Sequence, residues 1–431
     1  MSGKTLDEII AAAYIEEGLT EQDILGDAGA VSSGNLALDH ILGVGGFPRG
    51  RSIELSGLSQ AGKTTIACQV AAAAQRNGET VVYIDFEQAL DEPYLNALGV
   101  RTRDPADPTR FHPLFRPYPA ASLEQGMEVA GDAVRSGEVG VIVFDSVAAM
   151  TPRKSVEEYS DSRMQAAERA RVLGYALSSL NPNLARTKTT AIFINHIRDV
   201  IETGPTRPGM PKRTTTVGGS ALKFYASVRA EFTTSFPGAK TFKHERFDVL
   251  TGEKVDEPYA VLVKVKVTKN KLAPPFQSAV LYLELGKGFS NPYSAMSVLV
   301  GNKVVKKAGA YYYFPDSLYH PQMKSGDKGP SMQGIQSVLD LAELDTTWGV
   351  SLADAARSVL ADHRKQAPQV IPEPIEPDRG EPDPRSEPAV EALSLDESPT
   401  DPPAPVFAAT RASEGSGVRF SAPPPRTVGR S

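Results

Sequence analysis

Short apolar runs alternate with helical patterns over the first half of the chain. Helical spacing of apolar residues covers residues 64–76 and 122–135, and Ser122 with Gln125 forms a capping box at the second start. Buried strands separated by helices are typical of a parallel sheet, whose ligands gather at the carboxyl ends of the strands. The runs that predict such strands are residues 52–56, 80–85, 139–145 and 190–195. We therefore predict an α/β fold with a mainly parallel central sheet.

The hydrophobic pattern changes to a period of two between about residues 228 and 286. Val263 and Val265 alternate there with Lys264 and Lys266. A period of two predicts antiparallel strands with one buried face, here extending the sheet.

Beyond the predicted sheet, residues 287–365 combine a strand or hairpin at 308–314 with helical runs at 331–344 and 351–363. Residues 366–431 are rich in Pro, Glu, Asp, Ser and Ala without periodicity, which predicts disorder. The predicted segments are an N-terminal helix region (1–33), an α/β core (34–286), a small α/β C-terminal domain (287–365) and a disordered Pro-rich acidic tail (366–431). The first helix must bury its apolar stripe, either on its own core or on a neighbouring protomer.

The overall composition is ordinary for a soluble protein, with 23% charged and 41% hydrophobic residues and a net charge of −6. This charge argues against a uniformly basic nucleic-acid binder, but acidic residues gathered in the tail can hide a local basic surface. Cys68 is the single cysteine, which excludes an intrachain disulfide and fits a reducing cytoplasm. No apolar run approaches the roughly 20 residues that span a bilayer. We therefore expect a cytoplasmic protein with no membrane partner.

A phosphate-binding loop is predicted between the first strand and the helix that follows it. The sequence there fits G-x-x-x-x-G-K-[ST], with Lys63 placed to reach the β- and γ-phosphates of a nucleotide and Thr64 to place its hydroxyl on Mg²⁺. A Gly-rich turn without a ligand is the alternative, and the strand–loop–helix context disfavours it. The candidate nucleotide-binding residues are Gly57, Ser59, Gln60, Ala61, Gly62, Lys63, Thr64 and Thr65.

Two acidic residues follow other predicted strands at the same sheet edge. Asp145 ends the strand at 139–145 and is a candidate for holding Mg²⁺ through its water shell. Glu87 follows the strand at 80–85 and is placed to orient or deprotonate the attacking water. Taken alone, Asp145 is any strand-ending acid and Glu87 a solvated loop acid. Lys63 and His196, which follow the strands at 52–56 and 190–195, are expected on the same edge. This convergence favours the catalytic interpretation.

Two long loops and a lysine cluster carry weaker signals. The loop at 198–217 is rich in Lys, Arg and Thr, which suits contacts to a phosphate backbone, and the loop at 155–164 contributes Arg163 and Met164. For either loop alone, an ordinary surface loop is the simpler interpretation. The lysines at 264, 266, 269 and 271 fit a solvated basic strand as well as they fit a functional cluster.

The ordered set of motifs resembles RecA-type homologous recombinases, including divergent or phage-encoded members, from about residue 31 to residue 314. A phosphate loop is shared by many families, but the whole set is far more specific. Its landmarks beside that loop are SGNLALD (33–39), IDFEQALD (84–91), DSVAAMTP (145–152), FINHIR (193–198), GGSALKFYASVR (218–229) and KNK (269–271).

This resemblance implies a RecA-like P-loop ATPase core and a DNA-dependent ATPase. It would form a helical filament, a homo-oligomer, on single-stranded DNA and exchange strands with homologous double-stranded DNA in recombination and repair. The implied cofactors are ATP and Mg²⁺, and the implied location is the cytoplasm of a bacterium or of a phage-infected cell. A regulatory or mediator ATPase without strand exchange, and a hexameric helicase-like motor, are the alternatives.

The resemblance also implies roles for single residues. Glu87 would activate water, Lys63 and His196 would be further catalytic residues that act at the phosphates, and Asp91 with Tyr94 would contact adenine. Lys269 and Lys271 would reach the ATP of a neighbouring protomer, at an interface that includes Lys223, Phe224 and Arg229. The two loops would bind DNA, with Met164 and either Val200 or Ile201 as apolar wedges. The implied DNA-binding residues are Arg163, Met164, Arg198, Val200, Ile201, Lys212, Arg213, Thr215, Gly218, Gly219 and Ser220.

The sequence departs from the family pattern at His196 and at the pair Thr233 and Thr234. His196 replaces the usual glutamine at the residue that senses the γ-phosphate, and we expect the switch to persist with an altered pH dependence. Thr233 and Thr234 replace an arginine pair, which affects the expected site for the incoming duplex and supports the mediator alternative.

Overall fold

The computed structural model describes Thr5 and residues 29–153, 162–199, 214–217, 219–247, 254–326 and 328–366. These residues belong to one compact unit, Met1–Pro368. Four predicted segments therefore lie wholly or largely outside the described residues: the N-terminal helix region, most of the loops at 155–164 and 198–217, and the tail.

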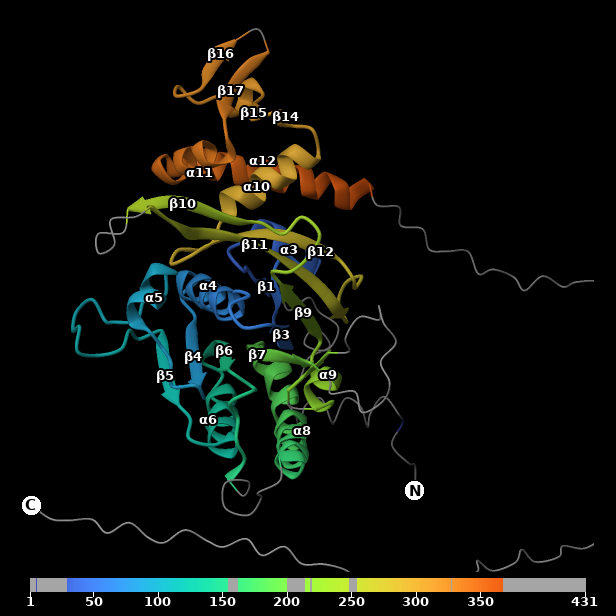
Figure 1. Cartoon of the computed structure of the whole chain (residues 1–431). Helices are drawn as coiled ribbons and strands as arrows, with labels where there is room; N and C mark the ends of the chain where they lie inside the picture. Colours follow the sequence, from blue (N-terminus) through green and yellow to red (C-terminus); the bar gives the residue numbers. More distant parts are fainter. Residues whose placement is uncertain are drawn as a thin grey trace, which may run out of the picture. The chain divides into compact units, whose positions relative to one another are not determined.

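One mixed sheet of 11 strands organises the described part of the chain (Figure 1). Its middle strands pair in parallel and those on one side pair antiparallel, which confirms the predicted α/β class. The strand order is β13 (Gly288–Phe289), β12 (Ser278–Glu284), β11 (Lys254–Asn270), β9 (Val228–Thr233), β3 (Ser52–Gly57), β7 (Thr190–Asp199), β6 (Val139–Asp145), β4 (Thr80–Asp85) and β5 (Phe115–Pro119), with β10 (Thr241–Phe247) on β11 and β8 (Thr214–Thr216) on β7.

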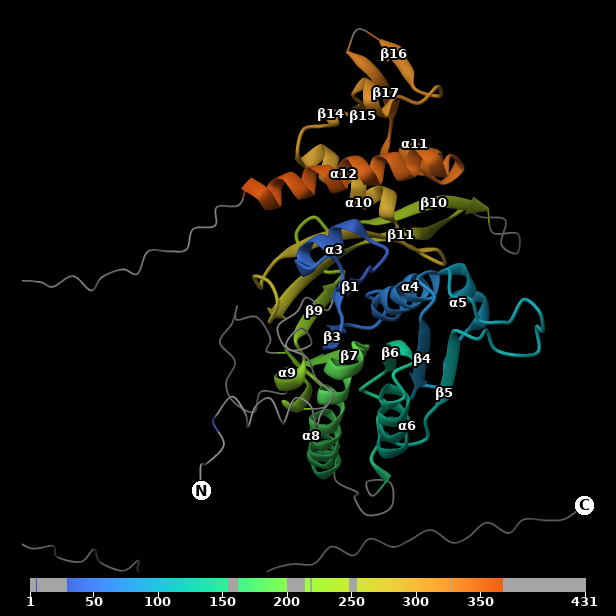
Figure 2. The ribbon, with the colours of Figure 1, turned by 180° about the vertical axis from the view of Figure 1, so that it is seen from behind.

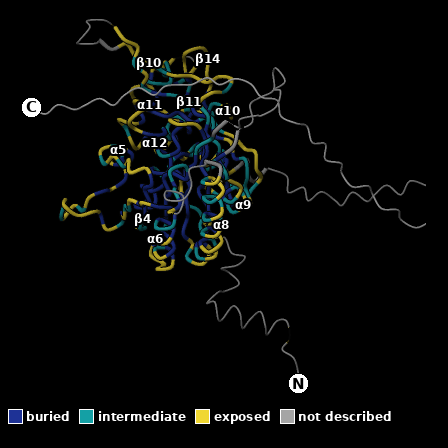
Figure 3. Tube along the Cα trace, turned by 60° about the horizontal axis from the view of Figure 1, so that its bottom comes forward, coloured by how far each residue is buried: buried dark blue, intermediate teal, exposed yellow. Residues whose placement is uncertain are grey.

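Helices cover both faces of the parallel strands, because successive side chains of a strand point to opposite faces. In β6, Val141 and Val143 belong to the cluster under α4 (Lys63–Arg76), whereas Ile142 and Phe144 belong to the cluster under α6 (Leu123–Arg135) and α8 (Ser162–Thr187). Phe144 stacks on Phe193 of β7, with ring centroids 4.3 Å apart. The strands consequently form the buried centre of the described residues (Figure 3).

Short elements complete this part of the fold. Asn35 caps α3 by accepting a hydrogen bond from Leu38 N at 3.2 Å, and its side-chain amide donates to Ser290 O at 3.2 Å. This residue therefore ties α3 to the start of α10. The elements concerned are α3 (Leu36–Leu42), α5 (Glu92–Ala97), α9 (Ala221–Tyr225), α10 (Asn291–Gly301) and the pair β1 (Ala30–Val31) with β2 (Phe47–Pro48).

The C-terminal elements form a third hydrophobic cluster around Trp348, and α10 packs against α12 (Figures 1 and 2). The predicted hairpin at 308–314 is confirmed as β14 and β15. The predicted helix at 331–344 is wrong over its first residues, because Ser331 pairs with Tyr313 in a strand. The elements are β14 (Lys306–Ala308), β15 (Tyr311–Tyr313), η1 (Asp316–Leu318), β16 (Lys324–Gly326), β17 (Gly329–Gln333), α11 (Ile335–Leu344) and α12 (Thr346–Gln366).

Strand β7 is longer than predicted. The sequence suggested an end at Asn195, but β7 continues to Asp199 because Ile197 to Asp199 pair with β8. Asn195 and His196 therefore lie within a strand and not at its end.

A buried ion pair links three central strands. The Glu54 side chain in β3 has no exposed surface, yet it carries a carboxylate. Arg229 in β9 donates to one oxygen of this carboxylate, and Asn195 in β7 donates to the other at 2.7 Å. A buried carboxylate needs such partners, because an unpaired charge in the interior is strongly unfavourable.

We predict that Arg229→Met lowers the free energy of unfolding by about 3–5 kcal/mol, because the Glu54 carboxylate stays buried without its cation. Urea unfolding followed by far-ultraviolet circular dichroism measures the loss. The matched control is Arg103→Met, since Arg103 pairs with Glu92 on the surface through two hydrogen bonds. Its loss should be much smaller, and equal losses would contradict the role of burial.

Candidate nucleotide-binding site

The phosphate loop connects β3 to α4, in the context that the sequence predicts. Gly57 has φ +155°, and a Cβ there would lie 2.4 Å from Phe232 O. Gly62 has φ +81° at the N-terminus of α4, where a Cβ would lie 2.6 Å from the Phe289 ring. Both positions therefore require glycine, for backbone conformation and for space.

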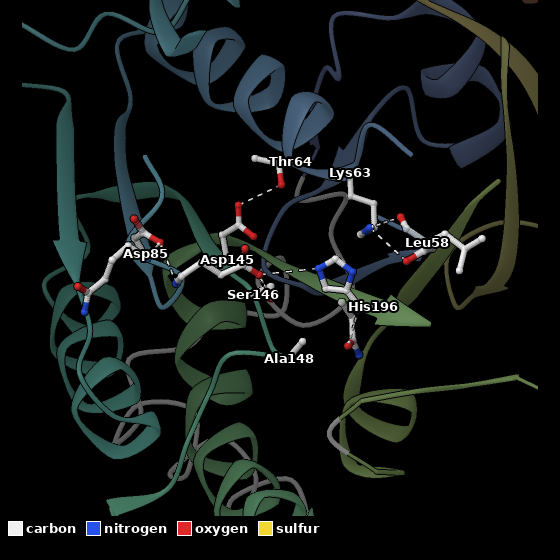
Figure 4. A network of polar contacts seen from close by, with 12 residues as sticks. Leu58, Lys63, Thr64, Asp85, Asp145, Ser146, Ala148 and His196 are labelled. Atoms are coloured by element: carbon white, nitrogen blue, oxygen red, sulfur yellow. Dashed lines mark hydrogen bonds and ion pairs between the residues drawn. The ribbon is translucent and has the colours of Figure 1, made fainter. Parts of the chain in front are cut away.

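Lys63 turns back into the loop that precedes it (Figure 4). Its Nζ donates to Leu58 O at 2.7 Å and to Gly57 O at 3.1 Å, and the residue is 4% exposed. Burial lowers the pKa of this ammonium from its usual 10.5 to about 8, against the opposing effect of the Asp145 and Glu87 carboxylates. The loop thus holds a cation in a place where its charge is only partly compensated.

Asp145 at the end of β6 contacts the first turn of α4. Thr64 Oγ1 donates to Asp145 Oδ2 at 3.1 Å, and Tyr83 Oη of β4 donates to the same oxygen at 2.7 Å (Figure 4 shows the Thr64 contact). Burial raises the pKa of Asp145 from 3.8 to about 6, the Tyr83 hydrogen bond lowers it, and the nearby Glu87 charge raises it.

Glu87 lies beside these groups, in the loop after β4. Ser146 Oγ donates to Glu87 Oε1, and His196 Nε2 lies 3.8 Å from the same oxygen. The loop is fixed by the Asp85 carboxylate, which accepts hydrogen bonds from the backbone N–H groups of Glu87 at 3.0 Å and of Gln88 at 2.8 Å. Glu87 therefore has fixed partners on its carboxylate and on its backbone, although 40% of its side chain is exposed.

His196 reaches this edge although β7 continues past it. In the register of β3 and β7, His196 stands opposite Gly57, the first glycine of the phosphate loop. The structure thus brings together Lys63, Thr64, Asp145, Glu87 and His196, as the strand pattern predicts.

A cavity of about 140 Å³ opens between α4 and the loop after β4. Asp91 and Tyr94, the residues matched to adenine contacts, line it together with Thr64, Glu87 and Asp145. Tyr94 Oη forms a 2.7 Å hydrogen bond with Thr65 Oγ1.

Other predicted site residues lie outside this cluster. Lys269 donates to the backbone oxygens of Lys223 and Phe224, both at 2.8 Å, and Phe224 is 74% exposed on α9. Lys271 N donates to Ser227 O at 3.0 Å. Among the residues matched to DNA contacts, Arg163 and Met164 lie on α8, Arg198 on β7 and Thr215 on β8, and Gly219 and Ser220 precede α9. Val200, Ile201, Lys212, Arg213 and Gly218 lie outside the described residues.

A family model described as RecA N-terminal domain matches residues 18–290, which is more than half of the chain. The chain belongs to the RecA family. Protein RecA of Fusobacterium nucleatum is 41% identical over 290 residues, covering 67% of this chain and 68% of that protein. Protein RecA of Xylella fastidiosa (strain 9a5c) is 39% identical over 285 residues, covering 66% of this chain and 74% of that protein.

A solved structure of the RadB recombinase aligns with 60% of this chain and 98% of that chain, at 19% identity and a TM-score of 0.40.

The RecA family membership confirms the interpretation as a DNA recombinase, a DNA-dependent ATPase that uses ATP in strand exchange, recombination and repair. Among the described helices of this RecA homologue, none is long and apolar enough to cross a membrane.

Two contacts in the site do not follow from the sequence patterns. Ser146 lies within the motif DSVAAMTP, and Tyr83 lies within the apolar strand at 80–85. The position of Tyr83 in its strand does indicate a place near Asp145. Tyr83 stands two residues before Asp85 in β4, and Asp85 is paired with Asp145 of β6. A tyrosine on the α4 side of a buried strand carries a hydroxyl that needs a partner.

We predict that affinity for ATP without Mg²⁺ falls as the pH rises above about 8, because Lys63 loses its proton near that pH and phosphates favour the ammonium. The loss between pH 8 and pH 9.5 should be roughly tenfold, measured with a fluorescent ATP analogue in the presence of EDTA. Lys63→Arg keeps its charge over this range, so its affinity, though lower, should vary less with pH. The same slope in both proteins would contradict the assignment.

Proposed function

We propose that this RecA homologue binds ATP at the cluster around the phosphate loop and couples the bound γ-phosphate to DNA binding. In this proposal Lys63 holds the β- and γ-phosphates, Glu87 orients the attacking water, and His196 senses the γ-phosphate. Asp91 and Tyr94 contact the base. The observation that carries the proposal is the position of His196, which stands opposite Gly57 and 3.8 Å from Glu87 on the strand that leads into residues 198–217.

Mg²⁺ fits the oxygen donors of Thr64 and Asp145, which lie 3.1 Å apart beside the phosphate loop. Among the described residues there is no group of three or more His, Cys, Asp or Glu that could hold a metal alone. That composition suits Mg²⁺, which proteins usually bind through one or two carboxylates, waters and the phosphates of the substrate. When bound, the ion would neutralise charge on the phosphates, with Thr64 as a ligand and Asp145 acting through water.

Coupling to DNA is supported by the way the second loop is attached. Val217 N donates to His196 O at 3.3 Å, and Asn195 Nδ2 donates to Val217 O at 2.9 Å. Arg198 and Thr215 are partners in the β7–β8 pair. Both ends of residues 200–213 are thus fastened to the strand that carries His196, so a shift of His196 toward a phosphate would move both ends. We infer that this loop and the loop at 155–164, with the matched residues of each, bind single-stranded DNA.

We further infer that the protomers assemble into a helical filament. Phe224 exposes 74% of its surface on a short helix, as an apolar side chain at an interface would. Lys269 lies against the same helix, and Lys269 and Lys271 would approach the ATP of the next protomer, where positive charge stabilises the transferring phosphoryl group. Arg229 is held by Glu54 within its own chain and would take part in the interface only through the residues around it. The same proposal includes homologous double-stranded DNA as the second substrate and a cytoplasmic location. It also includes the division of the chain into segments 1–33, 34–286, 287–365 and 366–431.

Negative-stain electron microscopy tests the filament. With single-stranded DNA and a non-hydrolysable ATP analogue, we expect continuous helical filaments, and Phe224→Ala should shorten or abolish them. Tyr175→Ala is the matched control, because Tyr175 is also an exposed aromatic residue, 79% exposed on α8. Rings would favour a helicase-like motor, and the absence of any assembly would contradict the filament.

Glu87→Gln should bind ATP but hydrolyse it at least about 100-fold more slowly, because the amide cannot accept a proton from water. Filaments of this variant should persist on DNA with ATP, measured as slow release of a labelled oligonucleotide. Glu92→Gln serves as the control, since Glu92 is an exposed acid that pairs with Arg103. Fast turnover by Glu87→Gln would remove Glu87 from the catalytic role.

A further inference from the structure

Tyr83 of β4 brings a buried phenol hydroxyl to Asp145 in the candidate nucleotide site. It lies in the middle of β4 with 1% of its surface exposed, and its ring belongs to the hydrophobic cluster under α4. Its hydroxyl lies 2.7 Å from Asp145 Oδ2. A phenylalanine would fill the same space, so the contribution specific to tyrosine is the set of polar contacts made by its hydroxyl.

The direction of the hydrogen bond is fixed by chemistry. An ionised carboxylate only accepts, so Tyr83 must donate to Asp145. Burial raises the pKa of Tyr83 well above 10, so the phenol keeps its proton at any working pH. The buried Cys68 thiol also interacts with the Tyr83 hydroxyl. The hydrogen bond between these two described residues therefore runs from the Tyr83 hydroxyl to the Asp145 carboxylate.

The two donors to Asp145 arrive from different elements. Thr64 Oγ1 approaches Oδ2 from the first turn of α4, and Tyr83 Oη approaches it from β4. One oxygen with two fixed donors leaves the carboxyl group little freedom to rotate. A carboxylate that binds a metal ion through water needs this orientation, because partners behind such ligands strongly affect metal affinity.

We propose that Tyr83 is a positioning residue that orients the Asp145 carboxylate toward the water shell of the nucleotide-bound Mg²⁺. This inference rests on the proposed role of Asp145. Tyr83 itself touches neither the nucleotide nor the ion, and its effect passes through Asp145 alone. Removing the hydroxyl should therefore weaken the use of Mg²⁺ while leaving nucleotide binding without the ion unchanged.

The test uses the full chain and Tyr83→Phe, with Tyr282→Phe as the matched control. Tyr282 is also fully buried, and its hydroxyl donates to Gln336 at 3.2 Å, far along the chain from the phosphate loop. Mg²⁺ is titrated while binding of a fluorescent ATP analogue is followed. Tyr83→Phe should need about tenfold more Mg²⁺ for half of the gain in affinity, with unchanged affinity in EDTA. The ATPase rate at saturating Mg²⁺ should stay within about twofold of the parent, which a general loss of structure would not allow.

Asp145→Asn separates this inference from the function on which it rests. If Asp145→Asn raises the Mg²⁺ requirement and Tyr83→Phe does not, the role of Tyr83 is wrong and that of Asp145 stands. If Asp145→Asn leaves the requirement unchanged, the role of Asp145 is wrong and that of Tyr83 falls with it. The double variant should need no more Mg²⁺ than Asp145→Asn alone, since Tyr83 acts through Asp145. A further rise in the double variant would overturn the inference.

Discussion

The register of the parallel strands decides where the chemistry of this RecA homologue lies. Gly57 is paired with His196, and Asp85 with Asp145, so four strands bring these residues to the same edge of the sheet. Register is set by the buried faces, because a slip of one residue would turn every apolar side chain of a strand to the opposite face. The hydrophobic clusters on the two sides of β6 therefore also fix the position of the carboxylate at its end.

Burial of charge is the second constraint on the site. The buried surroundings oppose the ammonium of Lys63 and the carboxylate of Asp145, as the lowered and raised pKa values show. Phosphate oxygens would compensate the first group, and a divalent cation the second. Binding of phosphates and of a divalent cation would therefore stabilise the folded protein. Glu54 shows the contrasting solution, since its charge is compensated inside the chain by Arg229.

Much of this arrangement could be predicted from sequence, because it depends on local patterns. The apolar strands, the Gly-rich loop and the acids at strand ends each occupy a few consecutive residues. Contacts between distant positions were not predictable in this way. Arg229 and Glu54 are 175 residues apart, and no periodicity links them. The extension of β7 depends on β8, which follows after an intervening loop, and the Ser331 strand depends on pairing with Tyr313.

The β7–β8 pair also affects how freely the sequence between these strands can change. Asp199 and Thr214 are paired, so residues 200–213 begin and end at neighbouring points held by the sheet. For a loop with fixed ends, doubling its length costs only about 0.6 kcal/mol in closure entropy. Insertions, prolines and new basic residues can therefore accumulate in this segment while Asn195 and His196 keep their places. The strand pair therefore separates a segment whose sequence can diverge from the residues that hold their places beside the phosphate loop.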